Sequence, residues 1–199
     1  MTQRQDLIAV RPIAEADVHT AVDTLTRAFA DYPFTRYVLA ADRHEDRIRR
    51  FQELCLTRIG MVYGRTWVAD GGLAVAAWTT PEQDPSPAFA ELGPLFGELA
   101  GDRAAAFEAA EEVVEPHRPQ EPVWFLNTVG VAPEAQGRGL GAAVLAPGIE
   151  AAARAGYPAF LETSTESNVA FYQRLGFEVS AEVPLEGGPH TWCMRRDPR

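Results

Sequence analysis

Apolar residues recur along this chain with two different periods, and the change of period predicts the order of its elements. Spacings of three and four predict helices over residues 15–29 and 43–59, after a short strand over 7–11. Two apolar runs over 66–69 and 73–78, joined by a glycine turn at 70–72, predict a β-hairpin. The first half of the chain therefore combines helices with antiparallel strands.

The second half predicts further strands around a glycine-lined helix. Helical pieces are expected over 89–99 and 103–114, and a proline-marked break separates them from a central strand over 123–131. A helix follows over about 137–155, with a kink at Pro147 because proline removes a helical hydrogen bond. Strands over 159–162, 177–183 and 191–194 complete the sheet. A short helix over 169–175, capped by Ser167 and Asn168, lies between the first two of these strands.

Composition and charge narrow the class of protein. The chain has 199 residues, which suits a single domain over 1–199, and 46% of them are hydrophobic, as in a soluble globular protein. Its net charge of -10 opposes the basic footprint that nucleic acid or an anionic membrane requires, so we expect neither partner and favour a small amine substrate. No apolar signal region opens the chain and no stretch approaches about 18 apolar residues, so we expect a cytoplasmic protein.

The spacing of cysteines and histidines indicates neither a disulfide framework nor a metal site. Cys55 and Cys193 are far apart and form no Cys-x-x-Cys pair. The histidines, at positions 19, 44, 117 and 190, have no metal-ligand spacing. We therefore expect no metal cofactor.

The most informative segment is the strand over 123–131 followed by a helix start that carries Gly137, Gly139 and Gly141. A helix N-terminus leaves about four backbone N–H groups unpaired and carries about half a positive charge, so it suits a pyrophosphate. A dinucleotide fold requires G-x-G-x-x-G, and a P-loop requires Lys and then Ser or Thr after its last glycine; the chain has neither. An ordinary surface turn before a helix remains an alternative at this point.

Two motifs in this order resemble the GNAT N-acetyltransferase superfamily. Gln136-x-x-Gly139-x-Gly141 is similar to its acetyl-coenzyme A signature, and Tyr172-x-x-x-Gly176-Phe177 to the helix beside the thioester. The resemblance extends along nearly the whole chain and implies an α/β fold of the α+β type, in which helices flank a central mixed, mostly antiparallel, twisted sheet. It implies acetyl-coenzyme A (acetyl-CoA) as cosubstrate, contacted by Val129, Gly130, Val131, Gln136, Gly137, Arg138, Gly139, Leu140, Gly141 and Asn168.

The resemblance assigns one candidate catalytic residue, Tyr172, and the end of a predicted strand supplies a second, Glu162. Tyr172 is the expected proton donor to the departing thiolate, whose parent thiol has a pKa near ~8.5. A half-buried core aromatic is the other interpretation of this residue. Glu162, at a strand end, is the first candidate for a general base, and a carboxylate paired for structural reasons is its alternative. A strong base is optional, because an α-amino group has a pKa near ~7.7 to 8.0.

The acceptor site is expected in the loop between the first helices. Several stretches, among them 28–33, 75–82, 115–119 and 191–194, resemble the puromycin-acetylating branch of the family, which implies the α-amine of puromycin or a related aminonucleoside as acceptor and antibiotic resistance as role. Phe34 and Tyr37 are bulkier than this resemblance leads us to expect. The candidate acceptor-binding residues are Asp31, Tyr32, Phe34, Trp78 and Trp124. A different small amine, a non-catalytic acetyl-CoA sensor and a homodimer remain open.

Overall fold

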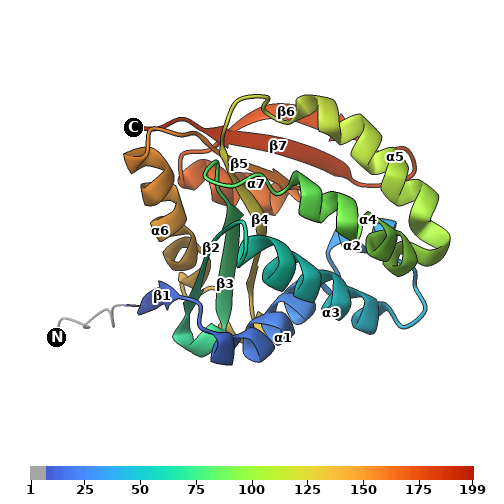
Figure 1. Cartoon of the computed structure of the whole chain (residues 1–199), viewed down its shortest axis with the longest axis horizontal. Helices are drawn as coiled ribbons and strands as arrows, with labels where there is room; N and C mark the ends of the chain where they lie inside the picture. The colour runs from blue at the N-terminus through green and yellow to red at the C-terminus, as the bar shows by residue number, and fades with distance from the viewer. Residues whose placement is uncertain (1–7) are drawn as a thin grey trace.

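A seven-stranded mixed sheet forms the centre of the protein, in a computed structural model that describes residues 8–199 (Figure 1). The strands are β1 (Val10–Pro12), β2 (Gly64–Ala69), β3 (Ala74–Thr79), β4 (Trp124–Val131), β5 (Ala159–Thr163), β6 (Glu178–Pro184) and β7 (His190–Arg196). Their order across the sheet is β1-β2-β3-β4-β5-β7-β6. Neighbouring strands are antiparallel except β4 and β5, which are parallel. The predicted mixed, mostly antiparallel sheet flanked by helices is therefore confirmed. The first residue of the predicted strand over 7–11 lies outside the described residues.

Helices cover both faces of the sheet. They are α1 (Val18–Phe29), α2 (Pro33–Val38), α3 (His44–Leu54), α4 (Ser86–Ala100), α5 (Ala104–Val114), α6 (Leu140–Arg154) and α7 (Glu166–Arg174). In Figure 1, α6 lies on one side of strands β2 to β4, and α1, α3, α4 and α5 lie on the other. Across residues 8–199, no helix has the length and apolar character needed to cross a bilayer.

The core follows these two layers. On the α6 side, Trp78 and Trp124 are fully buried together with apolar residues of α6 and β5. Helix α6 approaches β3 closely at Gly148. A Cβ atom on this residue would lie only 2.3 Å from Trp78 Nε1, so only glycine fits here. On the opposite side, three smaller clusters bury the inner faces of α1 to α5. Each face of the sheet thus has its own apolar layer, as strands covered on both sides require.

Two expectations for the first half of the chain were wrong in detail. The segment expected to be a loop around Asp31 continues into helix α2, which begins at Pro33 with Tyr32 as its N-cap residue. Proline is favoured at the first helical position because its missing N–H has no helical partner there. The helix predicted over 43–59 is α3 up to Leu54 and then a π-helix, η2 (Cys55–Gly60).

Strands β4 and β5 separate soon after they begin. Their pairing consists of Trp124 with Ala159 and Phe125 with Phe160, after which β4 continues to Val131 and β5 to Thr163 without pairing each other. On its other edge, β4 carries a β-bulge against β3, because Ala77 lies opposite Thr128 while Trp78 lies opposite Leu126. A bulge bends its strand and increases its twist. The result is a gap in the middle of the sheet, open towards the ends of β4 and β5.

Candidate functional site

The glycine-lined segment forms a backbone cradle at the start of α6. After β4 the chain makes a 3-10 turn, η6 (Pro133–Ala135), and α6 begins at Leu140, later than predicted. Gly137 and Gly139 have φ angles of 75° and 81°, in the left-handed region that favours glycine. No other heavy atom lies within 4 Å of the position that a Cβ of Gly137 would occupy. The first amides of a helix of 15 residues thus lie next to open backbone, which fits an anion.

Ion pairs hold the two ends of this cradle. The Arg138 guanidinium lies 2.8 Å from Asp70 in the turn between β2 and β3. Arg27 of α1 binds Glu134 of η6, with Nη1 and Oε1 2.9 Å apart. The Gln136 side-chain amide donates a hydrogen bond of 3.3 Å to the Val131 carbonyl. The predicted coenzyme residues of this segment are thus brought together around one loop.

The other residues that are predicted to contact the coenzyme can offer it only their backbone groups. Leu140, the first residue of α6, is buried, and Val129 and Val131 pack their side chains against the same apolar layer. Gly130 faces α1, where an added Cβ would lie 2.9 Å from Ala28 Cβ, so this glycine allows the helix to approach the strand. Their side chains therefore serve the core.

The last residue of β4 and the first turn of α6 meet α7. A Cβ on Gly141, in the first turn of α6, would lie 3.4 Å from Phe171 Cζ and 3.6 Å from Val131 Cγ2. Phe171 precedes Tyr172 on α7, and their ring centroids are 5.2 Å apart. The two sequence motifs, separated by some thirty positions in the chain, are thus neighbours in the fold.

A network of hydroxyl groups lines the end of β5. The Tyr32 hydroxyl lies 3.1 Å from Thr163 Oγ1 and accepts a hydrogen bond from the Ser164 backbone N–H. The Asn168 side-chain amide donates to the same Thr163 oxygen at 3.0 Å. Ser164 Oγ in turn lies 3.2 Å from Thr191 Oγ1 on β7. Tyr32 and Asn168, both predicted site residues, are therefore joined through Thr163.

The cap of α7 is Thr165, and the expected cap at Ser167 and Asn168 was wrong. Thr165 Oγ1 accepts a hydrogen bond of 3.3 Å from the Asn168 backbone N–H. A threonine that accepts from the third helical residue is a standard N-cap. This arrangement leaves the Asn168 side chain free of capping and directs it to Thr163.

Tyr172 is buried at the inner side of α7, with 5% of its surface exposed. Its ring packs against Phe171 and Phe177 in edge-to-face contacts. Burial, together with the neighbouring Tyr32 hydroxyl, raises the pKa of Tyr172 above its ordinary value. The hydroxyl therefore stays protonated throughout the neutral and moderately alkaline range.

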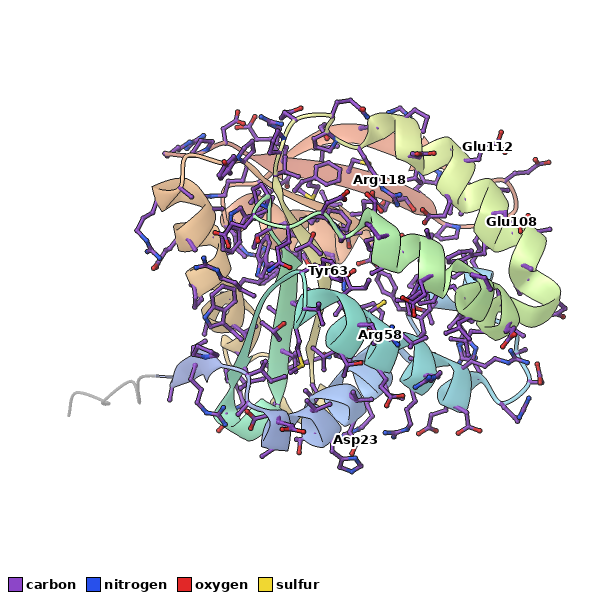
Figure 2. All side chains as sticks on the ribbon, in the orientation of Figure 1. Asp23, Arg58, Tyr63, Glu108, Glu112 and Arg118 are labelled. Carbon is purple, nitrogen blue, oxygen red and sulfur yellow. The ribbon has the colours of Figure 1, made fainter. Side chains whose placement is uncertain are left out.

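Glu162 is held by an arginine that the sequence did not single out as a site residue. Arg118 Nε lies 2.7 Å from Glu162 Oε1, and Arg118 Nη2 lies 3.1 Å from Oε2. Arg118 also binds Glu111 of α5 at 2.9 Å. Figure 2 shows Arg118 beneath α5, the helix that carries Glu108 and Glu112. Burial acts to lower the pKa of Arg118, but its bonds to Glu162 and Glu111 outweigh this and raise it.

The remaining predicted acceptor residues are dispersed. Asp31 is exposed and pairs with Arg36 at 2.7 Å, so it does not reach the hydroxyl network. Phe34, in α2, is partly buried against the hydrophobic cluster that includes Val38 and Phe160. Trp78 and Trp124 lie in the core beneath α6, which agrees with a packing role. In the part of the chain that the structure describes, no three His, Cys, Asp or Glu side chains gather as a metal site requires.

The sequence reading missed Thr163, Ser164 and Arg118 as parts of the site. A run of three hydroxyl residues over 163–165, directly after an apolar strand, was the available signal for the first two. Arg118 lies in a proline-rich segment that predicts a break between elements, and in the stretch 115–119 that carries part of the resemblance, neither of which indicates a partner for Glu162. Contacts between segments this far apart in the chain leave no local pattern.

Comparison with known proteins gives the family. The model of the acetyltransferase (GNAT) family matches residues 76–177, which include the cradle, α7 and the Thr163, Ser164 and Asn168 members of the hydroxyl network. A structure named histone acetyltransferase HPA2 and related acetyltransferase, from Corynebacterium glutamicum, is 29% identical, with a TM-score of 0.72 over 96% of this chain and 97% of that one.

Two more distant structures share the fold. The ribosomal-protein-S18-alanine N-acetyltransferase from Escherichia coli is 16% identical, with a TM-score of 0.56 over 96% of this chain and 94% of that one. The arylalkylamine N-acetyltransferase 2 from Aedes aegypti is 12% identical, with a TM-score of 0.60 over 98% of this chain and 100% of that one. Because the family model covers more than half of the chain, this protein belongs to the GNAT family of acetyltransferases.

Proposed function

We propose that this protein transfers the acetyl group of acetyl-CoA to a primary amine of a small molecule. The observation that carries the proposal is the backbone cradle at the start of α6, where Gly141 lies beside Phe171 of α7, the helix that also carries Asn168 and Tyr172. One end of this site fits phosphates and the other holds proton donors and acceptors. Acetyl-CoA supplies a thioester carbonyl that a neutral amine attacks, with release of the coenzyme as a thiolate.

The cradle supports the assignment of the coenzyme on physical grounds. Left-handed backbone at Gly137 and Gly139 turns the loop so that a phosphate reaches backbone N–H groups without meeting a side chain. Arg138 adds a cation beside the loop. We propose that these residues, with Gln136 and the backbone of Gly141, hold the pyrophosphate.

Tyr172 has the protonation state that its proposed role requires. A general acid must carry its proton at the working pH, and the raised pKa of this hydroxyl keeps it protonated. Its position on α7, one residue after Phe171, brings it near the start of α6. We propose that the Tyr172 hydroxyl gives its proton to the sulfur as the carbon–sulfur bond breaks, and that the proton which the acylated nitrogen loses returns to Tyr172 through water.

Glu162 acts on the amine through water in this account. Both of its carboxylate oxygens already accept hydrogen bonds from Arg118, so direct abstraction of a proton competes with a two-point ion pair. The demand on a base is small, because bringing an α-amine with a pKa near ~7.7 to 8.0 to its neutral form at pH 7 costs about 1 kcal/mol. A water molecule on a remaining lone pair of Glu162 is sufficient for this task.

For the acceptor we propose the α-amine of puromycin or a related aminonucleoside. Support comes from the resemblance of four segments to the puromycin-acetylating branch and from the partly buried rings of Phe29, Phe34 and Phe125, which pack against one hydrophobic cluster. Aromatic rings favour contact with an aromatic amino acid side chain. Acetylation removes the nucleophile with which puromycin accepts a growing peptide, so the role is antibiotic resistance in the cytoplasm.

Mass spectrometry tests this acceptor. The protein is incubated with acetyl-CoA and puromycin, and in parallel with an arylalkylamine, agmatine and a peptide that begins with alanine. We expect a single acetyl increment on puromycin and slower reaction of the other amines. Unmodified puromycin together with efficient acetylation of another amine overturns the aminonucleoside assignment, while the acetyltransferase assignment stands.

A further inference from the structure

The bulge in β4 lies where this strand loses its neighbour β5. Asn127 is the additional residue in the register between β3 and β4, and the pairing with β5 has ended at Phe125. A strand without a neighbour on one edge has unpaired backbone groups there and is less constrained in position. The half of β4 from Asn127 to Val131 is held in the sheet by β3 alone, so contacts from the adjoining helices add to its rigidity.

Two side-chain hydrogen bonds tie this half of β4 to the helix on the α1 side. The Asn127 side-chain amide donates a hydrogen bond of 3.0 Å to the Cys55 carbonyl. The Thr128 hydroxyl donates a hydrogen bond of 2.8 Å to Gln52 Oε1, and both of these side chains are buried. Because the bulge turns two consecutive residues to the same side, both reach the same helix.

The helix that receives these bonds changes its winding at the point of contact. Gln52 is in the last turn of α3, and Cys55 is the first residue of the π-helix η2. The far end of η2 rests on β3, where an added Cβ on Gly60 would lie 2.6 Å from Ala77 Cβ. Single π-helical turns are rare and occur frequently at functional sites. Here the wide turn lies between a strand contact at Cys55 and another at Gly60.

We propose that Gln52, the Cys55 carbonyl, Asn127 and Thr128 form a β4 clamp that positions, for the pantetheine arm of the coenzyme, the half of β4 that has no β5 neighbour. The proposal rests on the function proposed above. None of these four residues touches the reacting atoms in this account, so they are positioning residues. The clamp fixes the backbone at Val129 and Val131, whereas the cradle at the start of α6 depends on its own glycines.

This division gives the clamp a specific signature in binding. Acetyl-CoA contains the pantetheine arm, and 3′-phospho-ADP is the same coenzyme without that arm. Damage to the clamp weakens binding of acetyl-CoA and leaves binding of 3′-phospho-ADP unchanged. A variant that only loses stability has the same effect on both ligands, so the ratio of the two affinities does not change.

The test compares isosteric variants of buried threonines by calorimetry. Thr128→Val removes the hydroxyl that binds Gln52, Thr128→Ser restores it, and Thr26→Val is the matched control. Thr26 is also buried, and its hydroxyl binds the Val22 carbonyl within α1. We expect Thr128→Val to lower the affinity for acetyl-CoA about tenfold and the affinity for 3′-phospho-ADP less than about twofold. Only acetyl-CoA has the pantetheine arm, and only that arm depends on the preorganised strand. Thr128→Ser and Thr26→Val keep the wild-type ratio of the two affinities.

Asn127→Leu provides a second variant at a partly exposed position and should change the affinity ratio in the same direction. The clamp is overturned if Thr128→Val and Asn127→Leu leave the ratio unchanged, or if Thr26→Val changes it equally. Failure of the proposed function has a different outcome. If the wild-type protein binds acetyl-CoA but acetylates no amine, the proposed acetyl transfer is overturned. The ratios of the two affinities still decide whether the clamp exists.

Discussion

The two ends of the proposed site are built from different parts of the protein. The cradle for the coenzyme consists of backbone: left-handed glycines and the first amides of α6, within one short segment of the chain. The proposed reaction centre consists of side chains from three separate segments of the chain: Thr163 and Tyr172 are buried, and Tyr32 and Asn168 are partly buried. One end depends on chain conformation, and the other depends on tertiary packing.

This difference predicts how each end responds to mutation. In the cradle, adding any side chain obstructs the ligand and strains the backbone, while the hydrogen-bonding groups themselves cannot be removed by substitution. In the reaction centre, removing a single hydroxyl leaves the shape intact and deletes one function. Changes in the cradle should therefore act on binding, and changes in the reaction centre should act on turnover.

The largest expected effect is that of Gly139→Glu, which adds bulk and negative charge to the cradle. The φ of 81° at this residue also strains any side chain. We expect a folded protein with no measurable binding of acetyl-CoA in calorimetry. Gly156→Glu is the matched control, because Gly156 has a φ of 76° just beyond the other end of the same helix and an open environment. If folded Gly139→Glu binds acetyl-CoA with wild-type affinity, the cradle is not the binding site for the phosphates.

Tyr172→Phe should have the second largest effect, and it should act on turnover. The ring packing against Phe171 and Phe177 is kept, and only the hydroxyl is lost. General acid catalysis is typically worth ~10²- to 10⁴-fold, so kcat should fall within that range while the affinity for acetyl-CoA stays close to that of the wild type. An unchanged kcat, under conditions in which chemistry limits turnover, returns Tyr172 to a packing role.

Tyr32→Phe should reduce kcat less, by about tenfold, because Tyr32 organises the network without donating the proton in this account. Its loss leaves the Ser164 N–H without an acceptor, which should lower the free energy of unfolding by about 1 to 3 kcal/mol. Steady-state kinetics and urea unfolding measure the two effects. Tyr157→Phe, at an exposed tyrosine, is the control. If Tyr32→Phe behaves as this control does, the hydroxyl network has no part in the reaction.

The smallest effect concerns pH. The pKa of Tyr172 is raised, so the acid form persists at higher pH than for a free tyrosine, whose pKa is about 10. As the pH increases, kcat/KM should therefore rise while the substrate amine loses its proton, near pH ~7.7 to 8.0, and then stay level to about pH 10. A second ionisation that lowers the rate between these values contradicts the assignment of Tyr172 as acid, provided that Tyr172→Phe lacks it.

The same contrast explains which features the sequence predicted. The cradle was predictable because glycine spacing after an apolar strand is a local signal, and the succession of helices and strands along the chain followed from hydrophobic periods. Helix α2 was missed because Asp31, Tyr32 and Pro33 are also typical of a turn. The π-helix after Leu54 has no pattern that separates it from a continuing α-helix.

The reaction centre was predictable only through the family resemblance. Tyr172 and Asn168 lie within a motif, but the bond between Tyr32 and Thr163 joins residues 131 positions apart. The pairing of Glu162 with Arg118 likewise depends on how α5 packs over the sheet. The charge and apolar pattern of each segment are compatible with many such pairings, and the tertiary fold selects one.

The most direct test of the account measures release of free thiol from acetyl-CoA by the purified wild-type protein, with and without a panel of primary amines. If the cradle delivers the coenzyme to a working reaction centre, thiol release should depend on an amine and match the amount of acetylated product. Tight binding of acetyl-CoA without amine-dependent release would contradict the account, because it would leave a coenzyme-binding protein with no transfer reaction.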